Sequence, residues 1–161
     1  MGKEGLDKMG HKIVKKKELI VLCGTSNCGK STYAKKLKGY ALINSDTIRL
    51  HLTGTTALGE REGEVWGLFN ALKLDSKKKG ENVILDACHI SSQARWHALQ
   101  DMDEYYKICV LFDVRLKTVK KRCGMRWAIE MWRDFQEVKP TKADLLYEGF
   151  DEVRIIREGE R

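Results

Sequence analysis

The chain has 161 residues, of which 42% are hydrophobic and 33% charged, with a single proline. This composition is typical of one folded globular domain and excludes disordered and collagen-like chains. The formal net charge of +7 favours anionic partners such as nucleotides or nucleic acid. No apolar run is long enough to span a bilayer, so we expect no membrane association.

The first 17 residues differ in composition from the rest of the chain. They hold six lysines against Glu4 and Asp7, and they lack the apolar core of a secretory signal. We therefore predict a basic extension over residues 1–17, followed by one domain over residues 18–161. The extension is either a disordered arm that binds a nucleic-acid backbone or a solubilising tail.

The cysteines and histidines indicate a reducing compartment. The five cysteines include no C-x-x-C pair, and the four histidines show no metal-ligand spacing. This pattern predicts neither a disulfide framework nor a structural zinc site, and it favours a cytoplasmic protein.

Short apolar runs alternate with helical patterns along the chain. The runs predict strands at residues 19–23, 40–43, 83–85, 108–112 and 153–156. Helices are expected at residues 30–37, 46–52, 66–79, 92–99, around Val119, and at 127–137 and 141–148. The stretch 54–64 lacks periodicity and is predicted to be a mobile loop. Strands that are apolar throughout and alternate with helices predict an α/β fold, with a parallel five-stranded sheet covered on both faces.

A phosphate-binding motif follows the first predicted strand. Residues Gly24-Thr25-Ser26-Asn27-Cys28-Gly29-Lys30-Ser31 match G-x-x-x-x-G-K-[ST], with Thr32 next. Glycine permits the sharp turn and the close approach of backbone N–H groups to phosphate oxygens. The lysine reaches the β- and γ-phosphates, and the serine hydroxyl ligates Mg²⁺. The motif predicts a P-loop domain that binds a nucleoside triphosphate and Mg²⁺, and the lack of a guanine-reading N-K-x-D motif favours ATP as the donor.

Two carboxylates follow predicted strands at the edge where ligands collect in such sheets. Asp46 stands three residues before Arg49, and the two are expected on one helix face, where they would take a proton from an acceptor hydroxyl and hold an acceptor phosphate. The alternative is that Asp46 caps the helix and Arg49 is solvated. Asp86 is expected to hold Mg²⁺ or to line the acceptor site, or else to cap the next turn.

A basic stretch from Arg115 to Arg126 contains six basic residues and no acid. Most of these are expected on a solvated helix face. Arg122 and Arg126 flank Gly124, and we expect them to form a lid over the transferring phosphoryl group, with surface positions as the alternative. The side chains of Trp96, Trp127 and Trp132 are expected to pack in the core or a groove rather than to stack on bases.

These motifs, in this order and spacing, resemble the polynucleotide 5′-hydroxyl kinases of phage and bacterial end repair. The resemblance rests on GTSNCGKST, NSDTIR, VILDACH and RCGMR, and it extends from about Glu18 to the C-terminus. It implies transfer of the γ-phosphate of ATP to 5′-hydroxyl ends of DNA or RNA. Related kinases often carry Thr-Asn at the positions of Cys88 and His89.

The resemblance also implies a role for each site residue. Lys30 and Ser31 would bind ATP and its metal, Asp46 would be the general base, and Arg49 would hold the acceptor phosphate. Asp86 would line the acceptor pocket, while Arg126, helped by Arg122, would clamp the donor phosphates. Two other functions stay open: a P-loop kinase for a small-molecule hydroxyl, such as a nucleoside, sugar acid or antibiotic, and a nucleotide-binding switch. The sequence indicates no oligomeric state.

Overall fold

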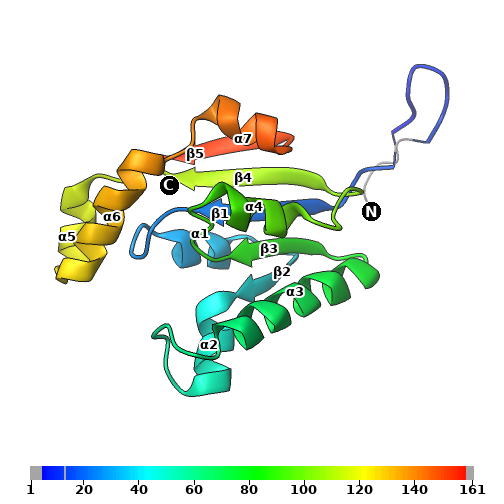
Figure 1. The fold of residues 1–161 in the computed structure, drawn as a ribbon. Coiled ribbons are helices and arrows are strands. Elements are labelled where there is room, and N and C mark those ends of the chain that lie inside the picture. Colours follow the sequence, from blue (N-terminus) through cyan, green and yellow to red (C-terminus); the bar gives the residue numbers. More distant parts are fainter. Residues whose placement is uncertain (1–4, 13, 159–161) are drawn as a thin grey trace.

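The computed structural model describes residues 5–12 and 14–158 and shows one α/β body with a central sheet (Figure 1). Within these ranges the strands are β1 (Glu18–Cys23), β2 (Tyr40–Asn44), β3 (Asn82–Asp86), β4 (Tyr106–Phe112) and β5 (Glu152–Ile156). All pairings are parallel, and the strand order is β2-β3-β1-β4-β5. From β1 the chain first adds β2 and β3 on one side of β1 and then β4 and β5 on the other side. The loop after β1 therefore lies at a topological switch point, where ligands bind in such sheets.

Helices cover both faces of this sheet. The described helices are α1 (Lys30–Lys36), α2 (Ser45–Thr53), α3 (Glu62–Lys78), α4 (Ser92–Leu99), α5 (Leu116–Arg122), α6 (Arg126–Val138) and α7 (Lys142–Glu148). Because side chains alternate along a strand, β1 sends Leu19 and Val21 to one face and Ile20 and Leu22 to the other. The predicted parallel sheet between two helical layers is confirmed.

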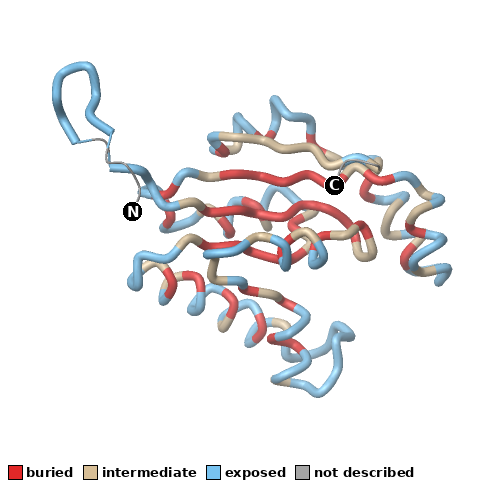
Figure 2. The backbone as a smooth tube through the Cα atoms, turned by 180° about the vertical axis from the view of Figure 1, so that it is seen from behind, coloured by how far each residue is buried: buried red, intermediate tan, exposed pale blue. Residues whose placement is uncertain are grey.

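Two hydrophobic cores form on the opposite faces. One core joins the sheet to α3 and α7, for example through Phe69 and Leu145. The other joins it to α1 and α5, for example through Ala34 and Val119. Figure 2 shows the central strands buried along their length, whereas the helices bury only one side. A sheet buried on both faces fixes the ends of its strands, which is where the polar residues described below are placed.

One predicted boundary was wrong, and it bears on the site. The segment 54–64 was expected to be a loop throughout, but α3 begins at Glu62. Asp and Glu in a first helical turn interact favourably with the helix dipole, and Glu62 and Glu64 both lie there. Glu62 is therefore held on a helix that packs against α2.

Residues 5–12 of the basic extension lie apart from the body (Figure 1), whereas Lys17 accepts a backbone hydrogen bond from Tyr106 at the start of β4. Residues 5–12 turn back on themselves through a bridge between Leu6 and Lys12. The Asp7 carboxylate stabilises the turn by accepting from the backbone N–H groups of Met9 and His11, each at 2.8 Å. The predictions made for residues 1–4 and 13 lie outside the described residues.

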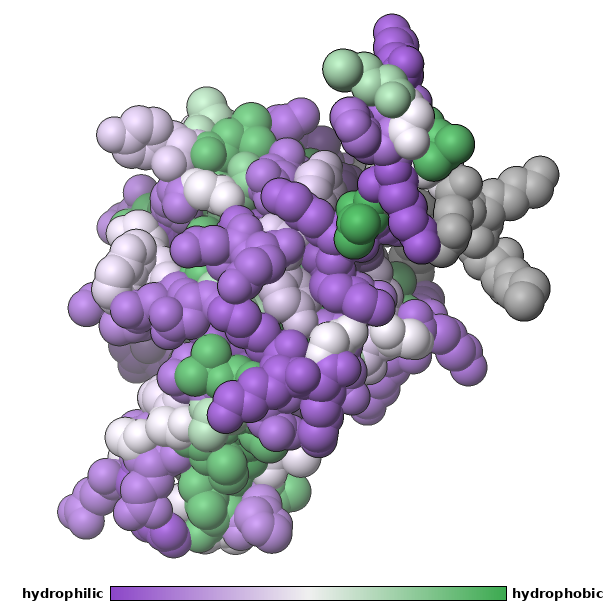
Figure 3. Space-filling view, turned by 90° about the vertical axis from the view of Figure 1, so that its right-hand side faces the viewer, coloured by the Kyte–Doolittle hydropathy of each residue, from purple (hydrophilic) through white to green (hydrophobic). Residues whose placement is uncertain are grey.

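The visible surface is mainly polar. Figure 3 shows hydrophilic side chains over most of one face, with apolar side chains gathered on the lower part, at the level of α2 and α3 in Figure 1. Among the described residues, no helix combines the length and apolar character that crossing a membrane requires.

Candidate active site

The loop between β1 and α1 has the backbone geometry that its glycines permit. Gly29 has φ 101° and Asn27 φ 63°, both in the left-handed region. A Cβ on Gly24 would lie 2.8 Å from the Cys28 sulfur and 3.0 Å from Cβ of Phe112. The loop therefore needs glycine at position 24 for space and at position 29 for conformation.

Lys30 begins α1 and points back into this loop. Its side chain is buried, and its ammonium donates to the carbonyl oxygens of Thr25 at 2.6 Å and Gly24 at 3.0 Å. A buried ammonium needs such partners because its desolvation is costly. The lysine is thus held at the loop that it would share with bound phosphates.

The side chains of Ser31 and Asp86 are hydrogen-bonded to each other at the carboxyl ends of the strands. The Ser31 hydroxyl donates to Oδ2 of Asp86 at 2.9 Å, and the Asn44 amide donates to the same oxygen at 2.7 Å. This contact follows from the topology: β3 lies between β1 and β2, and Asn44 is in register with Asp86. Both contacts of Asp86 are with side chains of other elements, so the alternative in which Asp86 merely caps the next turn is wrong.

Asn44 also caps the N-terminus of α2. Its side-chain oxygen accepts from the backbone N–H of Thr47 at 2.7 Å, an N-cap that satisfies one unpaired donor of the helix. The cap orients the first turn of α2, which carries Asp46. The alternative in which Asp46 itself caps the helix is therefore wrong.

Arg49 lies between two carboxylates. It donates to Glu62 through Nε at 2.6 Å and Nη2 at 3.0 Å, and through Nη1 to Asp46 at 2.6 Å. Its side chain is only 4% exposed, whereas Asp46 is 67% exposed. The hydrogen bond from Arg49 lowers the pKa of Glu62 against the opposing effect of burial. The alternative of a solvated Arg49 is wrong.

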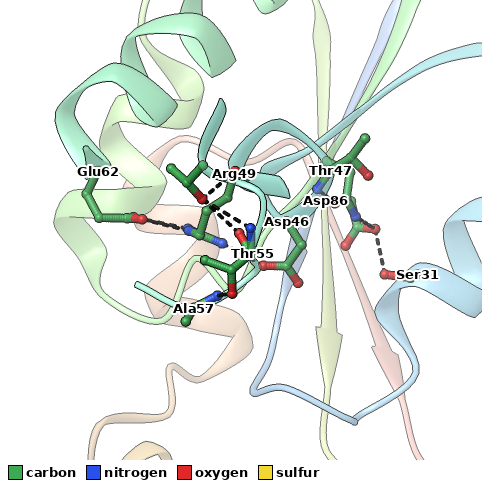
Figure 4. A network of polar contacts seen from close by, with 10 residues as sticks. Ser31, Asp46, Thr47, Arg49, Thr55, Ala57, Glu62 and Asp86 are labelled. Carbon is green, nitrogen blue, oxygen red and sulfur yellow. Dashed lines mark hydrogen bonds and ion pairs between the residues drawn. The ribbon is translucent and has the colours of Figure 1, made fainter. Parts of the chain in front are cut away.

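One open cleft of about 2220 Å³ is lined by Lys30, Ser31, Asn44, Asp46, Arg49 and Asp86, whereas Glu62 lies behind Arg49 and does not line it. Figure 4 shows Arg49 flanked by Glu62 and Asp46, with Asp86 and Ser31 beyond Asp46. Of the predicted phosphate-loop residues, Gly24 and the buried Thr25 do not line the cleft; the others do, namely Ser26, Asn27, Cys28, Gly29, Lys30, Ser31 and Thr32. The cleft therefore holds both the Asp46–Arg49 pair and the phosphate-binding loop.

The two predicted lid arginines occupy different environments. Arg122 ends α5, lines the cleft, and donates to the carbonyl oxygen of Asn27 at 3.0 Å. Arg126 begins α6, is 91% exposed, pairs with Glu130 at 2.6 Å and does not line the cleft. The role of Arg126 on the donor phosphates stays a prediction.

The aromatic residues are only partly where the sequence predicts them. Trp132 packs against the second core and donates to Val114, as expected. Trp127 lines the cleft but is 52% exposed, and Trp96 is 58% exposed outside it. His89 is buried with its Nδ1 2.8 Å from the Leu22 carbonyl oxygen, and burial lowers its pKa to about 4.

Sequence reasoning missed three residues of the site. Asn44 carried a readable signal, since an Asn at the end of a strand and before a helix is a typical N-cap. Glu62 and Trp66 carried none, because Glu62 contacts Arg49 on another helix and the opening of Trp66 onto the cleft depends on how α3 packs. Their roles depend on how α2 packs against α3.

A five-stranded parallel sheet with this loop, lysine, serine and strand-end aspartate defines a P-loop nucleotide-binding domain of the kinase type. Residues 19–140 match the model of the AAA domain family. The chain belongs to this family.

A curated protein of similar sequence indicates which kind of P-loop protein the chain resembles. The chain is 33% identical over 127 residues to a candidate bifunctional polynucleotide kinase/RNA ligase of Autographa californica nuclear polyhedrosis virus. The match covers 69% of this chain but only 18% of the viral protein. The resemblance to polynucleotide kinases that the motifs indicate is thereby confirmed.

Solved structures give the same fold. A chain of a Pnkp1/Rnl/Hen1 complex is 26% identical, with a TM-score of 0.59 over 71% of this chain and 41% of that one. Shikimate kinase from Acinetobacter baumannii is 18% identical, with a TM-score of 0.56 over 89% of this chain and 86% of that one. The likeness to shikimate kinase is one of fold alone.

Proposed function

We propose that the chain transfers the γ-phosphate of ATP to the 5′-hydroxyl end of a DNA or RNA strand. The observation that carries this proposal is the exposed carboxylate of Asp46, held by Arg49 in the same cleft as Lys30 and Ser31. The identity to the viral polynucleotide kinase/RNA ligase supports a nucleic-acid acceptor.

The donor would bind on the phosphate loop. Backbone N–H groups around Gly29 and the Lys30 ammonium suit the phosphates, and phosphate oxygens would compete for the protons that Lys30 now donates to loop carbonyls. Arg122, which contacts the loop at Asn27, would neutralise charge on the transferring group.

The residues present fit a magnesium ion that arrives with the nucleotide. The Ser31 hydroxyl and the Asp86 carboxylate are hard oxygen ligands 2.9 Å apart. Among the described residues, no cluster of three His, Cys, Asp or Glu side chains could hold a metal alone. Mg²⁺ usually takes one or two carboxylates plus phosphates and water, and when bound here it would neutralise negative charge on the donor phosphates.

Asp46 would act as the general base. It accepts the proton of the 5′-hydroxyl as the acceptor oxygen bonds to the γ-phosphorus, and the bond between that phosphorus and the β,γ-bridging oxygen breaks, so that ADP leaves with the electron pair. Three of the five Arg49 N–H groups hold Glu62 and Asp46, which leaves two to contact an acceptor phosphate.

The test is transfer of labelled γ-phosphate from ATP and Mg²⁺ to a 5′-hydroxyl oligonucleotide, beside its 5′-phosphorylated twin. Label on the first alone is the expected result. A panel of nucleosides and sugar acids serves as the comparison, at low and physiological salt. An oligonucleotide that engages several basic groups should bind more weakly at the higher salt, whereas a neutral acceptor should not.

Label on a small molecule but on neither oligonucleotide would overturn the proposal in favour of a small-molecule kinase. ATP binding without transfer to any acceptor would overturn it in favour of a nucleotide-binding switch.

A further inference from the structure

Trp66 presents an aromatic surface to the cleft. It lies on α3, its side chain is 42% exposed, and it lines the same cleft as Asp46 and Ser31. The buried face of α3 carries Val65, Phe69 and Lys73, so Trp66 stands at the edge of that face. A single exposed tryptophan needs no explanation, but one that lines the cleft holding Asp46 and Ser31 calls for one.

The Trp66 ring packs against a buried aromatic side chain. Phe69, which is buried, contacts it edge-on, with ring centroids 5.2 Å apart and planes inclined by 65°. Phe69 in turn lies 6.1 Å from the ring of His89. A ring supported by buried aromatic neighbours offers its open surface at little further entropic cost.

The ring also belongs to the acceptor side of the cleft. Trp66 follows Glu62 by one helical turn, and its side chain adds to the lowering of the pKa of Glu62 after the larger effect of Arg49. Glu62 holds Arg49, and Arg49 holds Asp46. The tryptophan thus stands on α3 one turn from the residue that holds Arg49 and, through Arg49, the proposed general base.

We propose that Trp66 stacks on the 5′-terminal nucleobase of the acceptor strand and so places its hydroxyl at Asp46. This inference rests on the proposed function and deepens it. Stacking on an aromatic side chain is tolerant of base identity, which suits an enzyme that acts on strand ends of any sequence. A sugar acid has no such face, so the residue selects nucleotide acceptors.

The experiment compares Trp66→Ala and Trp66→Phe with Trp96→Ala. Trp96 is also exposed but lies on α4 outside the cleft, which makes it the matched control. Each protein receives two oligonucleotides, one with a normal 5′-terminal nucleotide and one whose 5′-terminal nucleotide lacks its base. Steady-state kinetics and oligonucleotide binding by anisotropy are both measured.

With the normal strand, Trp66→Ala should lower kcat/KM about 10-fold, within the range for loss of one base–aromatic stack. Most of this change should appear in KM for the strand, with KM for ATP unchanged. Trp66→Phe should retain most activity. With the base-free end, the wild type and Trp66→Ala should be equal, because the stacking partner is already absent.

The outcomes separate the two proposals. Wild-type transfer to both strands with Trp66→Ala equal to Trp96→Ala would overturn the stacking role alone. An equal loss for both acceptors in Trp66→Ala would also overturn it, since the ring would then act through the fold. No transfer and no oligonucleotide binding by the wild type would overturn the proposed function, and this inference with it.

Discussion

Glu62 holds the guanidinium of Arg49 by two parallel hydrogen bonds, from Nε at 2.6 Å and from Nη2 at 3.0 Å. The third bond of Arg49 goes to Asp46. A planar guanidinium gripped on one edge by a carboxylate can turn little, so its opposite side offers Asp46 a fixed partner. Glu62 is therefore a positioning residue for the proposed general base.

Glu62→Ala should destabilise the protein and impair the reaction. It leaves the buried Arg49 short of a counter-charge, which we expect to cost about 1–3 kcal/mol of unfolding free energy. Urea denaturation measures this, and kcat/KM for the acceptor should fall in parallel. The control is Glu64→Ala, whose pair with Arg61 is exposed and screened by solvent and should therefore contribute little to stability. Equal stability of the two variants would contradict the positioning role.

Asp46→Asn should abolish most transfer while leaving the fold intact. Loss of a general base commonly lowers the rate by about 10² to 10⁴, and the Asp46 side chain is exposed, so little packing is lost. ATP binding, measured by calorimetry, should be unchanged. Asp75→Asn removes another exposed carboxylate, on α3, and should retain the wild-type rate. A fully active Asp46→Asn enzyme would refute the assignment of the base.

Ser31→Ala and Asp86→Asn should each raise the Mg²⁺ concentration needed for half-maximal rate, by about 10-fold or more. Ser31→Ala removes the hydroxyl, and Asp86→Asn removes the negative charge, of two groups that meet at 2.9 Å. Magnesium titration of the initial rate provides the measurement. Ser92→Ala, on the surface of α4, is the control. An unchanged magnesium dependence in both variants would remove Ser31 and Asp86 from the metal site.

Arg122 and Arg126 should behave differently. Arg122→Ala removes a charged donor from the phosphate loop and should weaken ATP binding about 10-fold. Arg126→Ala should leave ATP binding unchanged and lower kcat if the arginine closes over the donor during the reaction. Lys120→Ala, on the exposed side of α5, should alter neither quantity. A wild-type kcat for Arg126→Ala would exclude the predicted lid role.

His89 should make stability depend on pH in the acid range. Its pKa falls to about 4 in the fold from an ordinary value of 6.5 because burial disfavours the charged ring. Between pH 6.5 and pH 4 the His89 ring is protonated in the unfolded chain but neutral in the folded one. The contribution of His89 to stability is therefore fully present above about pH 6.5. It falls as the pH drops, by up to about 1.4 kcal/mol per pH unit. Urea denaturation at pH 7, 6 and 5 would show the slope.

His89→Gln should flatten that slope, whereas His51→Gln, at an exposed position on α2, should preserve it. A slope in His89→Gln as steep as in the wild type would assign the acid sensitivity to other groups.

Much of the donor half of the site could be read from the chain. One short loop contains Gly24, Gly29, Lys30 and Ser31. Their spacing is set by the backbone geometry of a few consecutive residues, so a short sequence motif is enough to reveal it. The strands were equally readable because each is a short apolar run buried on both faces. Asp86 could be placed at a strand end for the same reason.

The acceptor half was decided by packing between distant segments. Glu62 reaches Arg49 only because α3 begins earlier than its hydrophobic periodicity indicates and packs against α2. Trp66 is the first residue of the helix predicted at residues 66–79, and nothing in that segment indicates that its ring opens onto the cleft. The sequence predicts one lid that contains both Arg122 and Arg126, but a break between α5 and α6 separates the two arginines.

Motifs therefore predicted the groups whose geometry depends on a few consecutive residues. Tertiary structure alone decided the partners of Arg49 and the surfaces that face the acceptor, because those contacts depend on the relative placement of whole helices. No pattern within a single segment contains that placement.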